Sequence, residues 1–146
     1  MKRIMITGAS GQLGLALNRL LKGQDNYELL RTDAFASEDG TIKSLDITDE
    51  TAVNVYVDNM KPDVIINCAA LTAVDLCESE QEKAYRINAL GPKYLAVAAE
   101  KNSATLVHIS TDYVFDGQGS VPYTEDTASN PISVYGKTKQ AGDEFV

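Results

Sequence analysis

The chain has 146 residues, a length typical of one domain, and its hydrophobic content of 44% is enough for a packed core. A formal net charge of −8 argues against nucleic acid and anionic membranes as partners, because both select a basic surface. No apolar run reaches the roughly 18 residues that a membrane-spanning helix needs, and the N-terminal run is too short for a signal peptide, so we expect a cytoplasmic protein. The two cysteines are too few for a disulfide framework, and no Cys/His cluster has metal-ligand spacing, so we expect no metal site.

The first part of the chain alternates short β-rich runs with a helical pattern. We predict strands over residues 3–7 and 28–32, and a short third strand over 41–45. Residues 11–22 carry leucines at helical spacing and stop at Gly23, which predicts a helix between the first two strands.

The same alternation continues through the middle of the chain. Residues 49–60 predict a helix with Asp49 as its N-cap, and residues 63–70 predict a strand that is buried on both faces. We then predict one long helix over residues 79–101, with Ser79 as its N-cap.

The last part holds one more strand, a loop and a helix. The strand is predicted over 105–110, and the Gly/Ser/Pro/Thr-rich stretch 117–130 predicts a functional loop. A final helix begins at Pro131 or Ser133. Alternating apolar strands and helices predict the α/β class, with a Rossmann-like, doubly wound parallel sheet in one dinucleotide-binding domain over 1–146.

A glycine-rich turn lies between the first predicted strand and the first helix. Residues 7–14 read TGASGQLG, with glycines three positions apart. Such glycines permit a tight turn, a close approach of backbone to a pyrophosphate, and close packing of helix on strand. The free N–H groups and dipole of the helix then favour a phosphate. The alternative is a structural turn without a ligand.

Acidic residues follow the second and third predicted strands. Asp33 lies 19 residues after Gly14, where a carboxylate accepts hydrogen bonds from an adenosine ribose. It would repel a 2′-phosphate and so favours NAD over NADP, although Arg31 nearby could soften that preference. Asp46 and Ile47 follow the third strand, where a loop could meet the adenine, and an ordinary solvated turn is the alternative for Asp46.

Tyr135 and Lys139 stand four residues apart in the last predicted helix, so they share one of its faces. An ammonium beside a phenol favours the phenolate and lowers the pKa of the phenol. A tyrosine tuned in this way can protonate a carbonyl oxygen as hydride reaches the carbon. On their own the two residues are a common helical spacing.

Together these motifs resemble a known family. The glycine turn, the Tyr-x-x-x-Lys pair and a hydroxyl residue between them look like the extended short-chain dehydrogenase/reductases. PDVIINCAALTAVD at 62–75, STDYVFDG at 110–117 and NPxxxYGKTK at 130–139 narrow the resemblance to the dTDP-4-dehydrorhamnose reductases.

The resemblance implies roles for individual residues. Thr111 would polarise the substrate carbonyl, Tyr135 would donate the proton, and Lys139 would hold the nicotinamide ribose and lower the pKa of Tyr135. The implied cofactor-binding residues are Gly8, Ser10, Gly11, Gln12, Leu13, Gly14, Asp33, Asp46, Ile47, Ala69, Ala70, Thr72, Asn88, Ser110, Tyr135 and Lys139. The implied substrate-binding residues are Thr72, Val74, Thr111, Asp112 and Tyr113.

Several of these residues have simpler interpretations that stay open. Thr111 could cap a turn, Asn88 could be a buried polar anchor, and Asp112 could form an Asx-turn. We expect His108, the single histidine, to have a core or sheet-face role rather than that of a general base.

The resemblance implies reduction of dTDP-4-dehydrorhamnose to dTDP-L-rhamnose by hydride from NADPH or NADH, in nucleotide-sugar and cell-surface polysaccharide biosynthesis. Members of that family are longer, with a C-terminal part that closes over the dTDP-sugar. We therefore expect a sheet truncated before its last strands and before the substrate domain, inactive alone. Its exposed edge would allow a homodimer.

Two other functions remain open. One is a non-catalytic regulatory subunit like the methionine adenosyltransferase β subunit, although the intact Thr111, Tyr135 and Lys139 favour an enzyme. The other is another extended short-chain enzyme acting on sugar nucleotides, an epimerase or a dehydratase, for which Asp112 beside Thr111 would suit a dehydratase.

Overall fold

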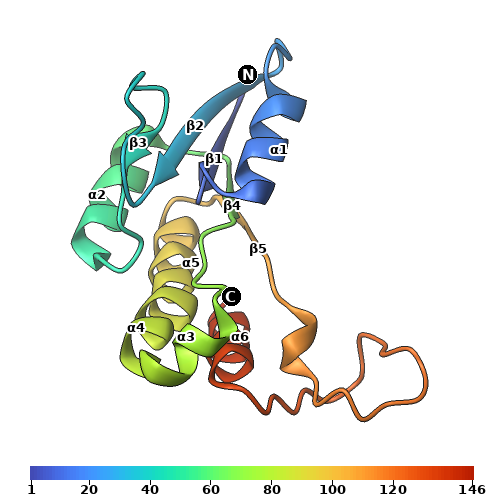
Figure 1. The fold of residues 1–146 in the computed structure, drawn as a ribbon. Helices are drawn as coiled ribbons and strands as arrows, with labels where there is room; N and C mark the ends of the chain where they lie inside the picture. Colours follow the sequence, from blue (N-terminus) through green and yellow to red (C-terminus); the bar gives the residue numbers. More distant parts are fainter.

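The structure is a computed structural model that describes residues 1–146. Its five strands are all parallel and form one sheet in the order β3-β2-β1-β4-β5 (Figure 1). Their bounds are Lys2–Thr7 (β1), Tyr27–Asp33 (β2), Lys43–Ser44 (β3), Val64–Asn67 (β4) and Thr105–His108 (β5). The chain builds outward from β1 first to one side and then to the other, which confirms the doubly wound, Rossmann-like fold. The crevice for a ligand in such a sheet lies at the carboxyl ends of β1 and β4, where the order reverses.

Helices flank the sheet and follow it beyond its carboxyl edge (Figure 1). They are α1 (Gln12–Leu21), α2 (Glu50–Met60), α3 (Val74–Ser79), α4 (Gln81–Tyr85), α5 (Gly91–Lys101) and α6 (Val134–Glu144), with a π-helical turn η1 (Arg86–Leu90) and a 3-10 turn η2 (Asp112–Val114). No helix combines the length and the apolar character needed to cross a membrane.

Alternate residues of the central strands serve two cores. Met5 and Ile65 are fully buried and belong to a cluster that residues of α2 and α5 complete. Ile4 and Ile6 point to the opposite face and pack against α1. This period of two is the expected pattern for a sheet covered by helices on both faces. The helices do not fully cover the edge strand β5, where Val107 is 42% exposed.

Two predicted helix starts are confirmed by their caps. The Asp49 carboxylate accepts a hydrogen bond from the N–H of Ala52 at 2.9 Å, and the Ser133 hydroxyl accepts one from Gly136 at 3.0 Å. Ser133, rather than Pro131, is therefore the residue that begins the last helix.

The predicted helix over residues 79–101 is confirmed from Gln81 to Lys101, but its predicted start at Ser79 is wrong. The segment is divided into α4, η1 and α5, and it is preceded by the unpredicted α3. Ser79 is the last residue of α3, not an N-cap, and the non-helical φ of −115° and ψ of 52° at Glu80 separate α3 from α4.

The π-helical turn has a physical cause two residues downstream of its last residue, Leu90. Pro92 has no N–H to offer to the preceding turn, so the regular i→i−4 bonding cannot continue there. The helix widens instead, and the N–H of Gly91 bonds to the carbonyl of Arg86, five residues earlier.

The remaining differences concern the carboxyl edge. The third strand has only two residues, and the strands predicted over 63–70 and 105–110 end at Asn67 and His108. Beyond those ends the chain turns away from the sheet, into α3 after β4 and into η2 after β5 (Figure 1). The predicted loop over 117–130 contains no helix or strand.

Candidate functional site

The glycine turn after β1 presses backbone against backbone. Gly8 has a φ of +63°, and a Cβ placed there would lie 2.7 Å from the amide nitrogen of Ala69. A Cβ on Gly14 would overlap the carbonyl oxygen of Gly8, so α1 can pack on the turn only with glycine there. Gly11 stands at the N-cap of α1 without a side-chain cap, which leaves the first N–H groups of the helix free for an anion.

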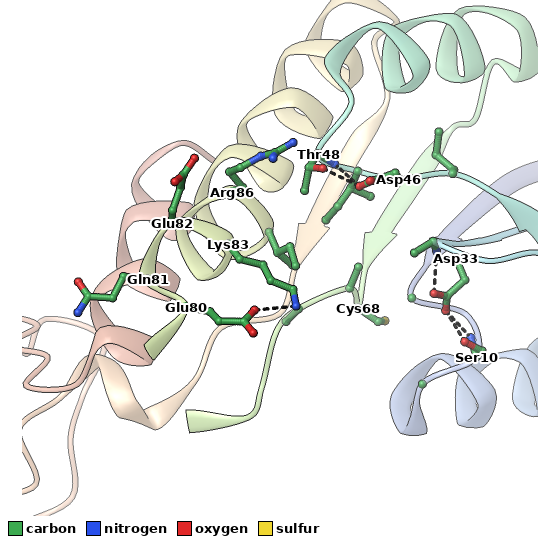
Figure 2. Close-up of a pocket in the computed structure, with 18 of the residues that line it drawn as sticks. Ser10, Asp33, Asp46, Thr48, Cys68, Glu80, Gln81, Glu82, Lys83 and Arg86 are labelled. Atoms are coloured by element: carbon green, nitrogen blue, oxygen red, sulfur yellow. Dashed lines mark hydrogen bonds and ion pairs between the residues drawn. The ribbon is translucent and has the colours of Figure 1, made fainter. Parts of the chain in front are cut away.

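The turn opens into a cavity of about 970 Å³, at the carboxyl edge of the sheet. Eight of the residues predicted to bind a cofactor line it: Gly8, Ser10, Gly11, Asp33, Asp46, Ile47, Ala69 and Ala70. Figure 2 shows Ser10 and Asp33 on one side, Glu80, Lys83 and Arg86 on the other, and Cys68 and Asp46 between them. The cavity is therefore a groove between the glycine turn and the α4 region.

Asp33 is fastened to the glycine turn. One carboxylate oxygen accepts hydrogen bonds from the amide of Ser10 at 3.0 Å and from its hydroxyl at 2.5 Å, and the other accepts one from Ala34 at 2.8 Å. These bonds set the place of the negative charge at the end of β2, which is the place predicted for a ribose-binding carboxylate.

The second acidic residue, Asp46, forms a turn, as its simpler interpretation held. Its carboxylate accepts from the N–H and from the hydroxyl of Thr48, each at 2.8 Å, which is the pattern of an Asx-turn. The same residue lines the cavity together with Ile47.

The far wall of the cavity was not predicted from the sequence. Lys83 forms a 2.7 Å ion pair with Glu80, and Arg86 stands one turn further along (Figure 2). The sequence does contain this basic pair, three residues apart. The predicted single helix over 79–101 gave no reason to place the pair at the carboxyl edge of the sheet. Exposed pairs of this kind contribute little stability, so these side chains can turn toward a bound anion at small cost.

The three predicted catalytic residues lie on α6 and on the segment that follows β5. Tyr135 and Lys139 lie on α6, and Thr111 follows β5 as the N-cap of η2, where its hydroxyl accepts a 3.3 Å hydrogen bond from Tyr113. The rings of Tyr113 and Tyr135 meet edge to face with their centroids 5.4 Å apart. Thr111 therefore caps a turn, as the simpler interpretation held, and the same turn carries Tyr113, whose ring contacts that of Tyr135.

Lys139 is 2% exposed, an unusual burial for an ammonium. Its Nζ donates to the carbonyl of Ile109 at 2.6 Å and lies 3.2 Å from Nε2 of His108, and it makes no hydrogen bond to the Tyr135 hydroxyl. Burial lowers the pKa of Lys139, and the nearby carboxylate of Asp143 partly raises it again.

Two residues predicted to bind cofactor make side-chain hydrogen bonds within the protein. The amide of Asn88 accepts from Leu71 N–H at 2.8 Å and donates to the Leu71 carbonyl at 3.0 Å and to Thr138 at 3.2 Å. The hydroxyl of Ser110 donates to Asp143. Asn88 is 1% exposed, so the structure gives it the role of a buried polar anchor.

The other predicted residues surround the two clusters without lining the cavity. Gln12 and Leu13 are exposed in the first turn of α1, Thr72 and Val74 lie at the start of α3, and Asp112 and Tyr113 lie in η2. Tyr113 is 47% exposed, so its ring is accessible to a ligand.

Comparison with known proteins gives consistent matches over the whole chain. A family model described as the RmlD substrate binding domain matches residues 1–146. The spore coat polysaccharide biosynthesis protein SpsK of Bacillus subtilis is 43% identical over 146 residues, which are 100% of this chain and 48% of SpsK. A dTDP-4-dehydrorhamnose reductase of Aggregatibacter actinomycetemcomitans is 44% identical over 100% of this chain and 47% of its own. Methionine adenosyltransferase 2 subunit beta of Xenopus laevis is 38% identical over 99% and 42%.

Solved structures agree. A dTDP-4-dehydrorhamnose reductase from Clostridium acetobutylicum superposes with a TM-score of 0.89 and 52% identity, over 98% of this chain and 48% of that one. The corresponding protein from Bacillus anthracis, solved in complex with NADP, gives a TM-score of 0.88 and 41% identity over 99% and 49%. The chain thus spans about half the length of the curated relatives that it matches.

Proposed function

The chain belongs to the RmlD substrate binding domain family, and from this premise we propose that its full-length protein is an NAD(P)H-dependent reductase of a dTDP-4-keto-6-deoxy sugar. The reaction proposed is that of dTDP-4-dehydrorhamnose to dTDP-L-rhamnose, a step of nucleotide-sugar and polysaccharide biosynthesis. The observation that carries the proposal is that the glycine-turn cavity and the helix of Tyr135 and Lys139 both meet the carboxyl edge of one parallel sheet.

The cavity fits a dinucleotide. A turn in which Gly8 touches the backbone of Ala69, followed by an uncapped helix N-terminus, suits a pyrophosphate, and the Asp33 carboxylate suits a ribose. We propose that residues 1–146 form the dinucleotide-binding part, and that sequence outside this chain supplies most of the sugar-binding part. The lengths of the relatives support this division.

In the proposed reaction a bound nicotinamide supplies hydride to the carbonyl carbon of the sugar. The Tyr135 hydroxyl gives its proton to the carbonyl oxygen, and the Thr111 hydroxyl donates a hydrogen bond to the same oxygen. Lys139, one turn further along α6, would hold the nicotinamide ribose. Tyr113, edge-on to Tyr135 and half exposed, supplies an apolar wall for the sugar nucleotide.

A second candidate function is that of a regulatory subunit. The identity of 38% with methionine adenosyltransferase 2 subunit beta favours it. The relatives named as reductases match this chain at similar or higher identity, and the chain retains Thr111, Tyr135 and Lys139, so we rank the enzyme first.

Turnover by the natural full-length protein tests the proposal. With dTDP-4-dehydrorhamnose and NADPH or NADH, we expect absorbance loss at the nicotinamide band and formation of dTDP-L-rhamnose. Tyr135→Phe should lower kcat by about 10²-fold or more, whereas Tyr56→Phe on the remote helix α2 should not change it. Absence of turnover, or equal rates for the Tyr135 variant and the parent, would reject the reductase.

A further inference from the structure

A chain of polar side chains runs behind the Tyr135–Lys139 helix. The Thr7 hydroxyl lies 2.6 Å from the side-chain oxygen of Asn67, whose amide nitrogen lies 3.0 Å from Nδ1 of His108. On the other side of the imidazole, Nε2 lies 3.2 Å from Nζ of Lys139 and 3.4 Å from Oδ1 of Asp143. The network thus connects the ends of β1, β4 and β5 with α6, and neither the cavity nor the proposed reaction accounts for His108 or Asp143.

The orientation of the Asn67 amide is fixed by a backbone group. The N–H of Ala69 can only donate, and it lies 3.2 Å from the Asn67 atom that also meets Thr7, so that atom is the oxygen. The nitrogen of Asn67 must therefore face His108 and donate to Nδ1. An accepting Nδ1 carries no proton, so the neutral imidazole of His108 carries its proton on Nε2.

This tautomer decides what Lys139 meets. The Nε2–H of His108 cannot accept a hydrogen bond, so a charged Lys139 donates to the Ile109 carbonyl instead. Oδ1 of Asp143 lies 3.4 Å from Nε2 and has no hydrogen-bond partner, so its negative charge acts on this site through proximity alone. When Lys139 is neutral, its lone pair can accept from Nε2–H across the 3.2 Å separation. Each protonation state of the buried amine therefore has a partner: the Ile109 carbonyl for the charged form and Nε2–H of His108 for the neutral form.

We propose that His108 and Asp143 are positioning residues for Lys139: His108, held in the Nε2–H tautomer by Asn67, fixes the place of the amine and stabilises its neutral form, and Asp143 stabilises its charged form. The importance of Lys139 for catalysis rests on the function proposed above, whereas the tautomer and the pairing do not.

The charges around the network agree with this assignment. Burial lowers the pKa of His108 to about 4, with the charge of Lys139 acting in the same direction and Asp143 against it, so the ring is neutral near pH 7. Asp143 on α6 is the charged group that raises the pKa of Lys139. Tyr135 on the same helix is titratable, and η1 contributes the uncharged Asn88, while β1 and β4 contribute the uncharged Thr7 and Asn67.

The tautomer can be measured directly on the 146-residue chain. His108 is its single histidine, so ¹⁵N shifts of one imidazole ring report the protonated nitrogen without assignment. We expect Nε2–H at pH 7. In Asn67→Asp a carboxylate replaces the donor, so we expect the proton on Nδ1 and a higher pKa for the ring. If the His108 ring of the parent chain is protonated on Nδ1, the proposal is overturned. This measurement on the parent does not depend on whether any variant folds.

Titration of the Lys139 ε-carbon signal, assigned by its loss in Lys139→Met, tests the pairing. Asp143→Asn should lower the titration midpoint. His108→Leu should raise it, because the neutral amine loses its donor, and His108→Gln should restore the parent value, since its amide N–H takes the place of Nε2–H. Equal midpoints in the parent, Asp143→Asn and His108→Leu would overturn the proposal.

Kinetics of the full-length protein supply the functional arm. The limb of the kcat/KM–pH profile that reports Lys139 should shift in the same direction as each midpoint, which a merely structural role would not do. We expect kcat to fall about tenfold in His108→Asn, whose short amide mimics only Nδ1, and less than about threefold in His108→Gln. Unshifted profiles in an active enzyme would contradict the proposal. Absence of turnover in the parent would reject the reductase function instead, and the two measurements on the chain would still decide the pairing.

Discussion

The side-chain amide of Asn88 donates a hydrogen bond to the hydroxyl of Thr138 at 3.2 Å and so joins the π-helical turn to α6. The same amide makes two hydrogen bonds with the backbone of Leu71, which follows β4. The helix that carries Tyr135 and Lys139 is thereby held against the segment that leaves the centre of the sheet.

Asn88→Asp should therefore destabilise the chain by about 3 kcal/mol, because it removes two donated bonds and buries a carboxylate against two oxygen atoms. Urea unfolding measures the loss. Asn59→Asp on the exposed side of α2 is the matched control and should cost less than about 1 kcal/mol. Equal losses in the two variants would show that the anchor contributes nothing.

Gly8→Ala should cost more than its backbone conformation alone explains. A left-handed φ costs a non-glycine residue about 1–2 kcal/mol, and at Gly8 the new Cβ would also meet Ala69 at 2.7 Å. Gly40→Ala is the control, because Gly40 has a φ of +69° with open space around it. In urea unfolding the Gly8 variant should be the less stable, and it should lose dinucleotide binding. Similar free energies of unfolding for the two variants would mean that the glycine turn accommodates the new Cβ without loss of stability.

The charge of Asp33 should set the choice between NADH and NADPH. Asp33→Asn removes the charge and keeps an oxygen for Ser10, so the affinity for NADPH relative to NADH should rise about tenfold. Ser10→Ala keeps the Asp33 charge but removes the hydroxyl that holds the carboxylate in place. The affinities for NADH and NADPH should therefore fall by the same factor. Calorimetric titration separates these effects, and an unchanged ratio in Asp33→Asn would exclude Asp33 as the selecting residue.

His108 should make the stability of the chain depend on pH between about 6.5 and 4. Its folded-state pKa of about 4 is below the unfolded value of 6.5, so the unfolded chain binds more protons in this window and stability falls as the pH is lowered. The loss attributable to this group is at most about 3 kcal/mol. Urea unfolding at pH 7 and pH 5 should show it, and His108→Gln should flatten the difference. A slope that persists unchanged in the variant would assign it to other groups.

The sequence predicted those features that depend on local chemistry. The glycine turn, the Asp49 and Ser133 caps and the strand cores follow from φ angles, cap hydrogen bonds and periodicity, which neighbouring residues determine. The π-helical turn before Pro92 also has a local cause, since proline lacks an N–H, but the leucine-poor, alanine-rich pattern around it gave no sign of the turn.

Side-chain directions at the carboxyl edge depend on tertiary contacts and were beyond the sequence. Asn88 turns inward because the π-helical turn faces Leu71 and Thr138, and Lys139 turns to Ile109 because α6 packs beside the end of β5. Lys83 and Arg86 reach the cavity only because α4 begins anew after Glu80. None of these relationships has a signature in residue spacing.

The most direct test is calorimetric titration of the 146-residue chain with NADH and NADPH. If the cavity beneath the glycine turn is a dinucleotide site, one equivalent of at least one nucleotide binds saturably, and Gly8→Ala abolishes the binding while Gly40→Ala retains it. Absence of heat with both nucleotides at millimolar concentration, in a chain shown to be folded, would contradict the assignment of this cavity.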